Sequence, residues 1–498
     1  MAAEIHSRPQ TARPVLLNKI EGHSDAVNAA VLIPKEDGVI TVSEDRTIRV
    51  WLKRDSGQYW PSIYHTVSSP CSCMSYHHDS RRIFIGQDNG AVVEFLISED
   101  FNKMSHVKTY PAHQSRVSDM VFSLESEWVV STGHDKSVSW MCTQSGSMLG
   151  RHYFTAWASC LQYDHETQHT FVGDYSGQIT LLKLEKQTYT IITTLKGHEG
   201  SVGALWWDPV QRLLFSGASD HSIIMWDIGG RKGRTLLLQG HHERVQALRY
   251  LQLTRQLMSC SADGGMAVWN MDTKREEAPQ WLDSDSCQKC EQPFFWNIKQ
   301  MWDTKTMGLR QHHCRKCGKA VCGKCSTKRS TFPIMGFEFP VRVCDACFDT
   351  IKEEDRTALA SFHEGKHNIA RMDMDPSRGL MVTCGSDRIV KVNNSSLIPD
   401  NRCMCQTLKP SDSPTKTNQI NIIAFTLLLL LLLQAVLNSK EEYIYLLIII
   451  NDHFVPDFLF LGFCLNFYFK DLSFFFFDDL TQFLCNRKTL FFYYIKCY

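Results

Sequence analysis

The sequence predicts a mainly β fold built from repeated units and interrupted by a metal-binding segment. Two observations lead to this prediction. A Gly-His pair, an Asp-containing turn and a strand ending in Trp recur at a nearly fixed separation. Four Cys-x-x-Cys pairs gather between residues 287 and 347, inside the series of repeats. With 498 residues, the chain is long enough for two or more domains.

The repeated unit carries its Trp 28 residues after its His in three copies: His23 and Trp51, His198 and Trp226, His241 and Trp269. A fourth copy has a separation of 27, from His113 to Trp140. Weaker copies at 86–90 and 173–177 keep only the turn and the following strand, and a seventh copy follows the cysteine pairs at 362–392.

These repeats resemble WD40 blades, each of which is a sheet of four antiparallel strands. The resemblance implies a seven-bladed β-propeller. His, Asp and Trp side chains can join one buried hydrogen-bonded network in each blade. We therefore expect these histidines and aspartates to be structural rather than catalytic or metal-binding.

The resemblance ends after Val392, where Asn393 and Asn394 replace the usual Trp-Asp pair. The outer strand of the last blade in a propeller is commonly supplied by the N-terminus, and residues 14–18 suit that role. The ring is then expected to close without the last tryptophan, whose loss costs roughly 3–5 kcal/mol.

The repeats, the cysteine pairs and the end of the resemblance divide the chain into four segments. Blades one to six are predicted at 1–275, a zinc finger at 281–352, a truncated seventh blade at 360–393 and a divergent tail at 394–498. The finger is expected at the junction of blades six and seven, because connecting loops tolerate insertions. Charged or proline-containing linkers at 276–280 and 353–360 are expected to be exposed tethers.

The four cysteine pairs have the spacing of zinc ligands, because one tight turn can present both thiolates at about 2.3 Å from the metal. Eight thiolates complete two four-coordinate sites without an open position, which indicates two structural Zn²⁺ ions. The order of the pairs suggests a cross-brace, although sequential pairing is an alternative. In the cross-brace, one group is Cys287, Cys290, Cys322 and Cys325, and the other is Cys314, Cys317, Cys344 and Cys347.

A strongly basic strip accompanies the second cysteine pair. Residues 310–329 contain seven Lys or Arg, two adjacent His and no acidic residue. Guanidinium groups bind phosphate oxygens bidentately, and histidines near pKa 6.5 would make anion affinity rise as pH falls. The strip is therefore predicted to receive an anion.

The run Arg310–Gly318, the four cysteine pairs and Arg342-Val343-Cys344 together resemble a FYVE zinc finger. The resemblance implies the cross-braced pairing and binding of phosphatidylinositol 3-phosphate on endosomal membranes. Gln311 departs from the family pattern, as does Trp281, which is followed by Asp283 and Asp285 rather than by a WxxD motif. The matching lipid-binding positions are Arg310, His312, His313, Arg315 and Arg342.

Apolar residues precede the basic strip and suggest a membrane-inserting tip. Phe294 and Phe295 are expected in the core of the finger. Met307 and Leu309 are the candidates for insertion into the bilayer, where a large apolar side chain contributes roughly 1.5–3 kcal/mol.

The layout over residues 1–392 resembles the WD-repeat- and FYVE-domain-containing proteins of early endosomes. It implies a scaffold in the cytosol and on the early endosome membrane, with protein partners on the propeller. The sequence shows no glycine-rich phosphate loop, open metal position or nucleophile–base pair, so no enzymatic activity is expected. Dimerisation would strengthen membrane binding by avidity. The alternative is a soluble adaptor whose finger is a RING-like protein-binding module.

General features of the chain agree with this interpretation. The formal net charge is zero, so no global attraction to nucleic acid is expected. The other cysteines are scattered, which is typical of a reducing compartment, and the N-terminus has no secretory pattern. In the tail, the uncharged span 422–437 is short for a membrane anchor, and its low-complexity composition favours poor order and aggregation.

Overall fold

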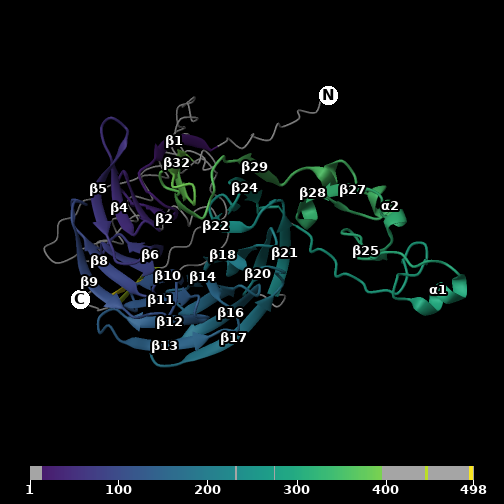
Figure 1. Cartoon of the computed structure of the whole chain (residues 1–498), viewed down its shortest axis with the longest axis horizontal. Coiled ribbons are helices and arrows are strands. Elements are labelled where there is room, and N and C mark those ends of the chain that lie inside the picture. The colour runs from purple at the N-terminus through teal and green to yellow at the C-terminus, as the bar shows by residue number, and fades with distance from the viewer. Residues whose placement is uncertain (1–13, 230–232, 274, 395–442, 447–492, 497–498) are drawn as a thin grey trace. The chain divides into compact units, whose positions relative to one another are not determined.

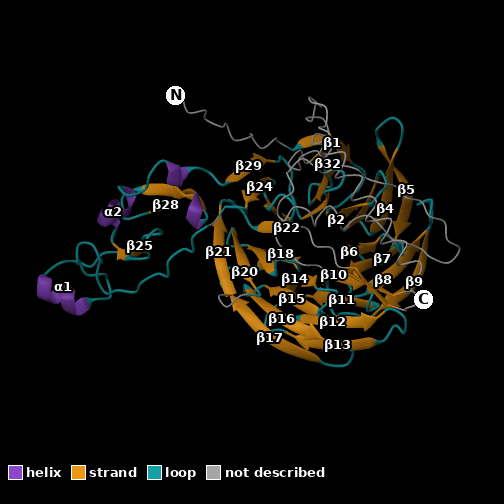
Figure 2. Cartoon of the chain, turned by 180° about the vertical axis from the view of Figure 1, so that it is seen from behind, coloured by secondary structure: helices purple, strands orange, loops and turns teal. Residues whose placement is uncertain are grey.

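The computed structural model describes residues 14–229, 233–273, 275–394, 443–446 and 493–496. Its main part is a ring of seven sheets set around a common centre, which confirms the predicted seven-bladed propeller (Figure 1). The helices of the described chain lie in the zinc-finger segment, whereas the blades are strands joined by loops (Figure 2).

Each of the first four blades takes four consecutive strands, and neighbouring strands are antiparallel. Blades one and two contain β2 (Val27–Leu32), β3 (Gly38–Ser43), β4 (Thr47–Lys53), β5 (Tyr59–Thr66), β6 (Cys71–His77), β7 (Arg82–Gln87), β8 (Val92–Ile97) and β9 (Met104–Tyr110). Blades three and four contain β10 (Val117–Ser123), β11 (Trp128–Gly133), β12 (Ser137–Cys142), β13 (Met148–Tyr153), β14 (Ala158–Tyr163), β15 (His169–Asp174), β16 (Gln178–Leu184) and β17 (Tyr189–Lys196).

Blade five also takes four consecutive strands, whereas blades six and seven each include one strand from a distant part of the chain. Blade five contains β18 (Val202–Asp208), β19 (Leu213–Ala218), β20 (Ser222–Asp227) and β21 (Gly233–Gln239). Blade six contains β22 (Val245–Leu251), β23 (Gln256–Ser261), β24 (Gly265–Asn270) and β29 (Ala360–Glu364). Blade seven contains β30 (Arg371–Asp375), β31 (Leu380–Cys384), β32 (Val390–Asn394) and β1 (Val15–Ile20).

The finger is inserted within blade six, not at the junction of blades six and seven. Its segment runs between β24 and β29, the third and fourth strands of that blade. The predicted seventh unit at 360–393 therefore begins with the outer strand of blade six. The discrepancy arises because each sequence repeat starts with the outer strand of one blade and ends with the third strand of the next.

The N-terminal strand closes the ring as expected. β1 pairs antiparallel with β32, from Ile20 opposite Val390 to Val15 opposite Asn394, and the two lie side by side in Figure 1. This pairing joins the first described strand to the last strand of the repeat array, so blade seven has four strands although its sequence repeat is truncated.

The repeated His, Asp and Trp side chains form buried networks. In blade one, His23 Nδ1 lies 2.8 Å from Asp45, and its Nε2 lies 2.7 Å from the Thr41 hydroxyl. Trp51 Nε1 donates to the same hydroxyl at 2.8 Å. Blades five and six repeat the His–hydroxyl–Trp contacts through Ser216 and Ser259. Each imidazole is used in packing its blade, which agrees with a structural role.

Trp140 is not part of such a network, although its spacing is only one residue shorter. Its indole nitrogen donates to the Glu185 carbonyl in the next blade at 2.9 Å. A shift of one residue along a strand moves a side chain to the opposite face of the sheet. Met141, ten residues after Ser131 as Trp51 is after Thr41, occupies the equivalent position and is buried.

In blade seven the network is incomplete. His367 Nδ1 lies 2.6 Å from Asp387, but its buried Nε2 has no hydrogen-bond partner among the described residues. Asn393 stands ten residues after Thr383, where a complete blade has Trp, and is buried. The closing blade therefore lacks the indole that covers the network in blades one, five and six.

We expect Asn393→Trp to stabilise the closing blade. A buried indole at this position would add apolar contact and a donor toward Thr383, raising the free energy of unfolding by about 1.5–3 kcal/mol. Asn394→Trp is the matched control, because its side chain lies on the other face. Denaturant titration of both variants measures the effect, and equal stabilities would contradict the assignment.

No helix in the described part of the chain is long and apolar enough to cross a membrane. The predictions for residues 394–498, including the span 422–437, lie outside the described residues except for Asn394, which ends β32, and two short strands. These are β33 (Tyr443–Leu446) and β34 (Tyr493–Lys496), which pair with each other.

The finger consists of short elements around a small core. They are α1 (Ile298–Thr304), β25 (His312–His313), β26 (Ala320–Val321), η1 (Gly323–Cys325), β27 (Arg329–Phe332), η2 (Pro333–Met335), β28 (Phe337–Arg342), α2 (Asp345–Phe348) and η3 (Glu354–Arg356). Phe294 is fully buried there, as expected, whereas Phe295 is 57% exposed and was wrongly placed in the core. The two neighbouring side chains point to opposite sides of the chain, so one is buried and the other exposed. The sequence does not indicate which of the two phenylalanines faces the core.

The finger is fastened to the propeller as well as tethered by its linkers. Gln239, at the end of β21, donates its backbone N–H to the Gly336 carbonyl at 2.8 Å, and β28 continues the sheet of blade five. Arg275 and Glu338 are both nearly fully buried, with a closest N–O distance of 3.8 Å. Arg275 also donates to the Pro333 carbonyl at 2.7 Å. The Gln239 contact holds the finger against blade five, and the Arg275 contacts fasten it to the end of blade six.

Candidate functional site

Eight cysteines of the finger form two clusters in the cross-braced grouping. Within each cluster the four sulfur atoms lie within 4.8 Å of one another. Cys290 Sγ and Cys322 Sγ are 3.7 Å apart, close to the roughly 3.8 Å expected between neighbouring sulfurs in a tetrahedral site with bonds of about 2.3 Å. The clusters are Cys287, Cys290, Cys322, Cys325 and Cys314, Cys317, Cys344, Cys347.

Backbone groups support the thiolates of both clusters. The Cys322 N–H points to Cys287 Sγ, and the Cys344 N–H points to Cys314 Sγ, each at 3.2 Å. Such hydrogen bonds stabilise the negative charge of a ligating sulfur. Four thiolates per cluster leave no position for substrate, so the donor sets fit two structural zinc ions.

Zinc content tests this arrangement. We expect two Zn²⁺ per chain by atomic emission, and Cys347→Ser to lose one of them, because three ligands and a hydroxyl hold the metal poorly. Cys142→Ser, which removes a propeller thiol outside both clusters, is the control and keeps two. Chelation should unfold the finger, because zinc supplies on the order of 10 kcal/mol to such folds. Two zinc ions in Cys347→Ser would contradict the assignment.

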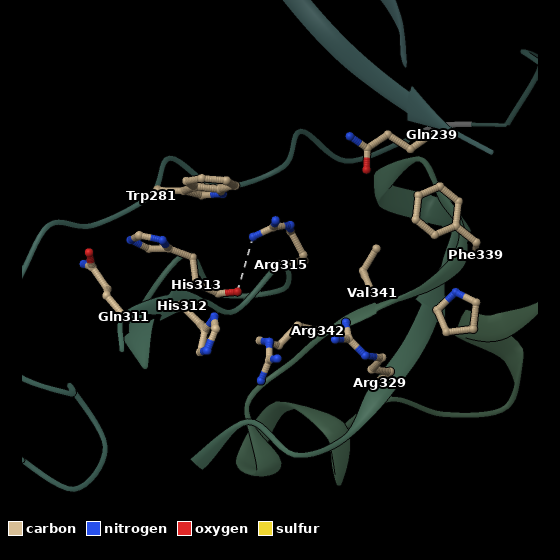
Figure 3. Close-up of a pocket in the computed structure, with 11 residues that line it drawn as sticks. Gln239, Trp281, Gln311, His312, His313, Arg315, Arg329, Phe339, Val341 and Arg342 are labelled. Carbon is tan, nitrogen blue, oxygen red and sulfur yellow. Dashed lines mark hydrogen bonds between the residues drawn. The ribbon is translucent and has the colours of Figure 1, made fainter. Parts of the chain in front are cut away.

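A cationic pocket of about 380 Å³ lies beside the second cluster (Figure 3). Among the residues that the structure describes, no acidic side chain lines it. Its charged or ionisable lining residues are His312, His313, Arg315, Arg329 and Arg342. The pocket therefore has the charge and the donors to bind a phosphate group.

Strand pairing places two of the arginines together. Arg329 on β27 is directly opposite Arg342 on β28, and residues in that relation lie on the same face of the sheet. Arg342 also donates to the Ser326 carbonyl at 2.7 Å, which limits the positions of its guanidinium. Adjacent positive charges without an acid are unfavourable by themselves, and an anion between them relieves the repulsion.

An indole orders the other side of the pocket. The Trp281 ring stacks on His313 with ring centroids 4.8 Å apart and an angle of 10° between the planes. The Arg315 guanidinium lies 4.4 Å from the same ring centroid, and Figure 3 shows the three side chains together. The Leu282 N–H donates to the Gly318 carbonyl at 2.9 Å, which fixes the segment carrying Trp281. Trp281 thus positions two candidate phosphate ligands.

Burial and neighbouring charge also affect His312. Burial first, and then the positive charges of Arg342 and Arg310, lower the pKa of His312. An anion in the pocket would offset those charges. The side-chain nitrogen of Gln311, which also lines the pocket, is buried without a partner in the described part of the chain. It is a neutral donor where the family pattern usually has a cation.

The structure gathers four of the five expected lipid-binding residues around one pocket, namely His312, His313, Arg315 and Arg342. Arg310 is exposed and does not line it. Sequence reasoning did not single out Arg329, Trp281 or Gln239 as ligand-site residues. Arg329 belongs to the basic strip, so charge could have indicated it. Gln239 carried no signal, because it comes from blade five.

The apolar loop lies between Cys290 and Cys314 and is closed at its base by a bridge between Phe294 and Leu309. Met307 is 81% exposed, and Trp302 in α1 is 84% exposed. Leu309 instead packs partly buried against the core of the finger. The loop therefore presents large apolar side chains to solvent at Met307 and Trp302.

The fold and these sites define a β-propeller carrying a two-zinc, anion-binding finger. Family models match this chain as FYVE zinc finger over residues 280–353 and as WD domain, G-beta repeat over 14–51, 104–140 and 189–227. Because relatives of that name match 79% of it at 81% identity, the chain belongs to the family of WD repeat and FYVE domain-containing proteins.

Several curated relatives support that membership. WD repeat and FYVE domain-containing protein 1 of Mus musculus and that of Homo sapiens are each 81% identical over 392 residues, covering 79% of this chain and 96% of the relative. WD repeat and FYVE domain-containing protein 2 of Homo sapiens is 63% identical over 79% of this chain and 98% of its own length. The WD40 propeller of Doa1 has a TM-score of 0.51 at 15% identity, covering 76% of this chain and 96% of that one, and shows the shared fold.

The two modules together support a phosphoinositide-binding adaptor or scaffold in membrane trafficking. Relatives named for repeat and finger modules, and a scaffold-type fold, indicate a non-enzymatic protein.

Proposed function

We propose that this protein is a peripheral scaffold of early endosome membranes, recruited from the cytosol by phosphatidylinositol 3-phosphate. The observation that carries the proposal is the acid-free pocket formed by His312, His313, Arg315, Arg329 and Arg342 on a finger with two zinc-binding clusters. Rigid loops with several guanidinium groups suit a single phosphate, and Gln311 and Gln239 offer neutral groups to ring hydroxyls.

Membrane contact would have two components. The pocket binds the headgroup, and Met307 with Trp302 enters the apolar part of the bilayer. Because Leu309 packs against the core of the finger, it supports the loop rather than inserting. Nearby basic side chains add about 1 kcal/mol each on an anionic surface. The propeller then carries protein partners to that membrane.

Arg315→Ala tests headgroup binding. We expect flotation with vesicles containing phosphatidylinositol 3-phosphate to weaken by about tenfold to a hundredfold, as for loss of a charged hydrogen-bond partner. Lys324→Ala removes one exposed charge of the finger outside the pocket and should weaken binding by no more than about fivefold.

Both variants must retain two zinc ions, which excludes unfolding of the finger as the cause. Equal binding of the native protein to vesicles with and without the lipid would refute the proposal and favour a protein-binding finger.

Met307→Glu separates insertion from headgroup recognition. We expect vesicle binding to fall by roughly tenfold or more, since a buried apolar side chain is replaced by a charge. Affinity for a soluble short-chain headgroup should stay unchanged, because Met307 does not line the pocket. Val210→Glu, at a propeller residue that is 77% exposed, is the control. Parallel losses for vesicle and soluble headgroup would contradict an insertion role.

A further inference from the structure

The headgroup pocket has one wall that does not come from the finger. Gln239, at the end of propeller strand β21, lines the pocket together with finger residues. Figure 3 shows its side chain extending toward the pocket from that strand. Its side-chain amide has no hydrogen-bond partner among the described residues, so both its donor and its acceptor are available to a ligand.

The position of Gln239 is set by backbone contacts rather than by its side chain. Its N–H donates to the Gly336 carbonyl, and it is the residue of β21 that pairs with β28. Gly336 has a φ of +86°, and a Cβ atom there would lie 1.8 Å from the Leu237 carbonyl oxygen. The two backbones approach so closely that only glycine fits. With the buried Arg275–Glu338 pair, this contact holds Gln239 at the edge of the pocket.

A second cavity, of about 390 Å³, lies on the other side of Arg315 and Trp281. It shares those two residues and Gln239 with the cationic pocket, but its propeller wall carries Glu199 and Asp220. Burial opposes ionisation of Asp220, yet hydrogen bonds from His198 and Ser222 outweigh it and lower the pKa to about 2. The carboxylate is therefore charged at neutral pH.

Gln239, Trp281 and Arg315 thus separate a cationic pocket from an acidic one. A phosphate on the cationic side meets guanidinium groups, whereas a further phosphate directed toward the partition meets carboxylates. Bringing a phosphate close to a carboxylate costs free energy, because both are negatively charged. Carboxylates beside a binding site therefore disfavour a ligand that carries the additional phosphate.

We propose that the propeller completes the headgroup site: Gln239 hydrogen-bonds a ring hydroxyl of the inositol, and Glu199 disfavours headgroups with an additional phosphate. This inference rests on the proposed function, because it assigns a selectivity device to the same pocket. Finger and propeller then form one composite binding site.

The test uses the full-length chain with short-chain phosphatidylinositol 3-phosphate, short-chain phosphatidylinositol 3,5-bisphosphate and inorganic phosphate as calorimetric probes. We expect Gln239→Ala to bind the monophosphate about fivefold more weakly, the effect of one lost hydrogen bond. Inorganic phosphate binding should not change, because phosphate lacks the ring. Gln239→Glu keeps the size of the side chain and should weaken the monophosphate further.

Glu199→Gln should strengthen binding rather than weaken it, and only for the bisphosphate. We expect its affinity for the bisphosphate to rise about fivefold, with that for the monophosphate within twofold of the native value. Gln58→Ala, at an exposed glutamine in blade one, is the matched control and should change neither. Zinc content of two per chain establishes that the finger of each variant is folded, and an unchanged thermal unfolding transition establishes the same for the propeller.

Failure of the proposed function and failure of the propeller contribution would give different results. If native protein ignores the monophosphate and Arg315→Ala changes nothing, the proposed function is wrong. If native binding depends on Arg315 but the Gln239 variants stay within twofold of native and Glu199→Gln leaves the ratio of the two lipids unchanged, only the propeller contribution is refuted.

Discussion

The function inferred for this protein depends on the tetrahedral grouping of thiolates in the finger. Eight cysteines from four separate turns converge on two centres, and every residue of the cationic pocket except Gln239 lies on a segment attached to those turns. Without the metal, the repulsion among Arg315, Arg329 and Arg342 would oppose this folded arrangement, and the small apolar core of the finger would do little to offset it. Zinc binding therefore supplies the free energy that holds uncompensated positive charges in place.

The propeller is stabilised by a different means, through networks that are repeated and partly dispensable. Blades one, five and six each bury a His, a hydroxyl and a Trp. Blade three substitutes Met141 at the Trp position and uses Trp140 to reach the next blade. Blade seven has lost its Trp, and its ring is closed by β1. Loss of one network is tolerated because each sheet also packs against two neighbours.

The attachment between the modules gives the finger a defined orientation toward blade five. A flexible tether would have left the cationic pocket open on the side where Gln239 now lies. Instead, the buried Arg275–Glu338 pair and the close backbone contact at Gly336 fix the docking. This docking places the Gln239 amide and the carboxylates of the propeller wall next to Arg315. A buried pair of this kind stabilises little in total, but removing one partner leaves an uncompensated charge. Its contribution is therefore mainly to specify one mode of docking.

The sequence by itself determined the classes of both modules, the eight cysteines suited to bind zinc and most of the pocket, whereas the structure decided how those cysteines group into two sets. These features are local: metal-ligand spacing, the density of Arg and His, and a repeat length are all contained in short segments. Only the tertiary structure decided that the finger interrupts blade six, that Trp140 faces the next blade, that Arg310 lies outside the pocket and that Phe295 is exposed. Each of these depends on which strand pairs with which and on which face a side chain lies. The part played by Gln239 was likewise out of reach, because about seventy residues separate it from the basic strip and only chain folding brings them together.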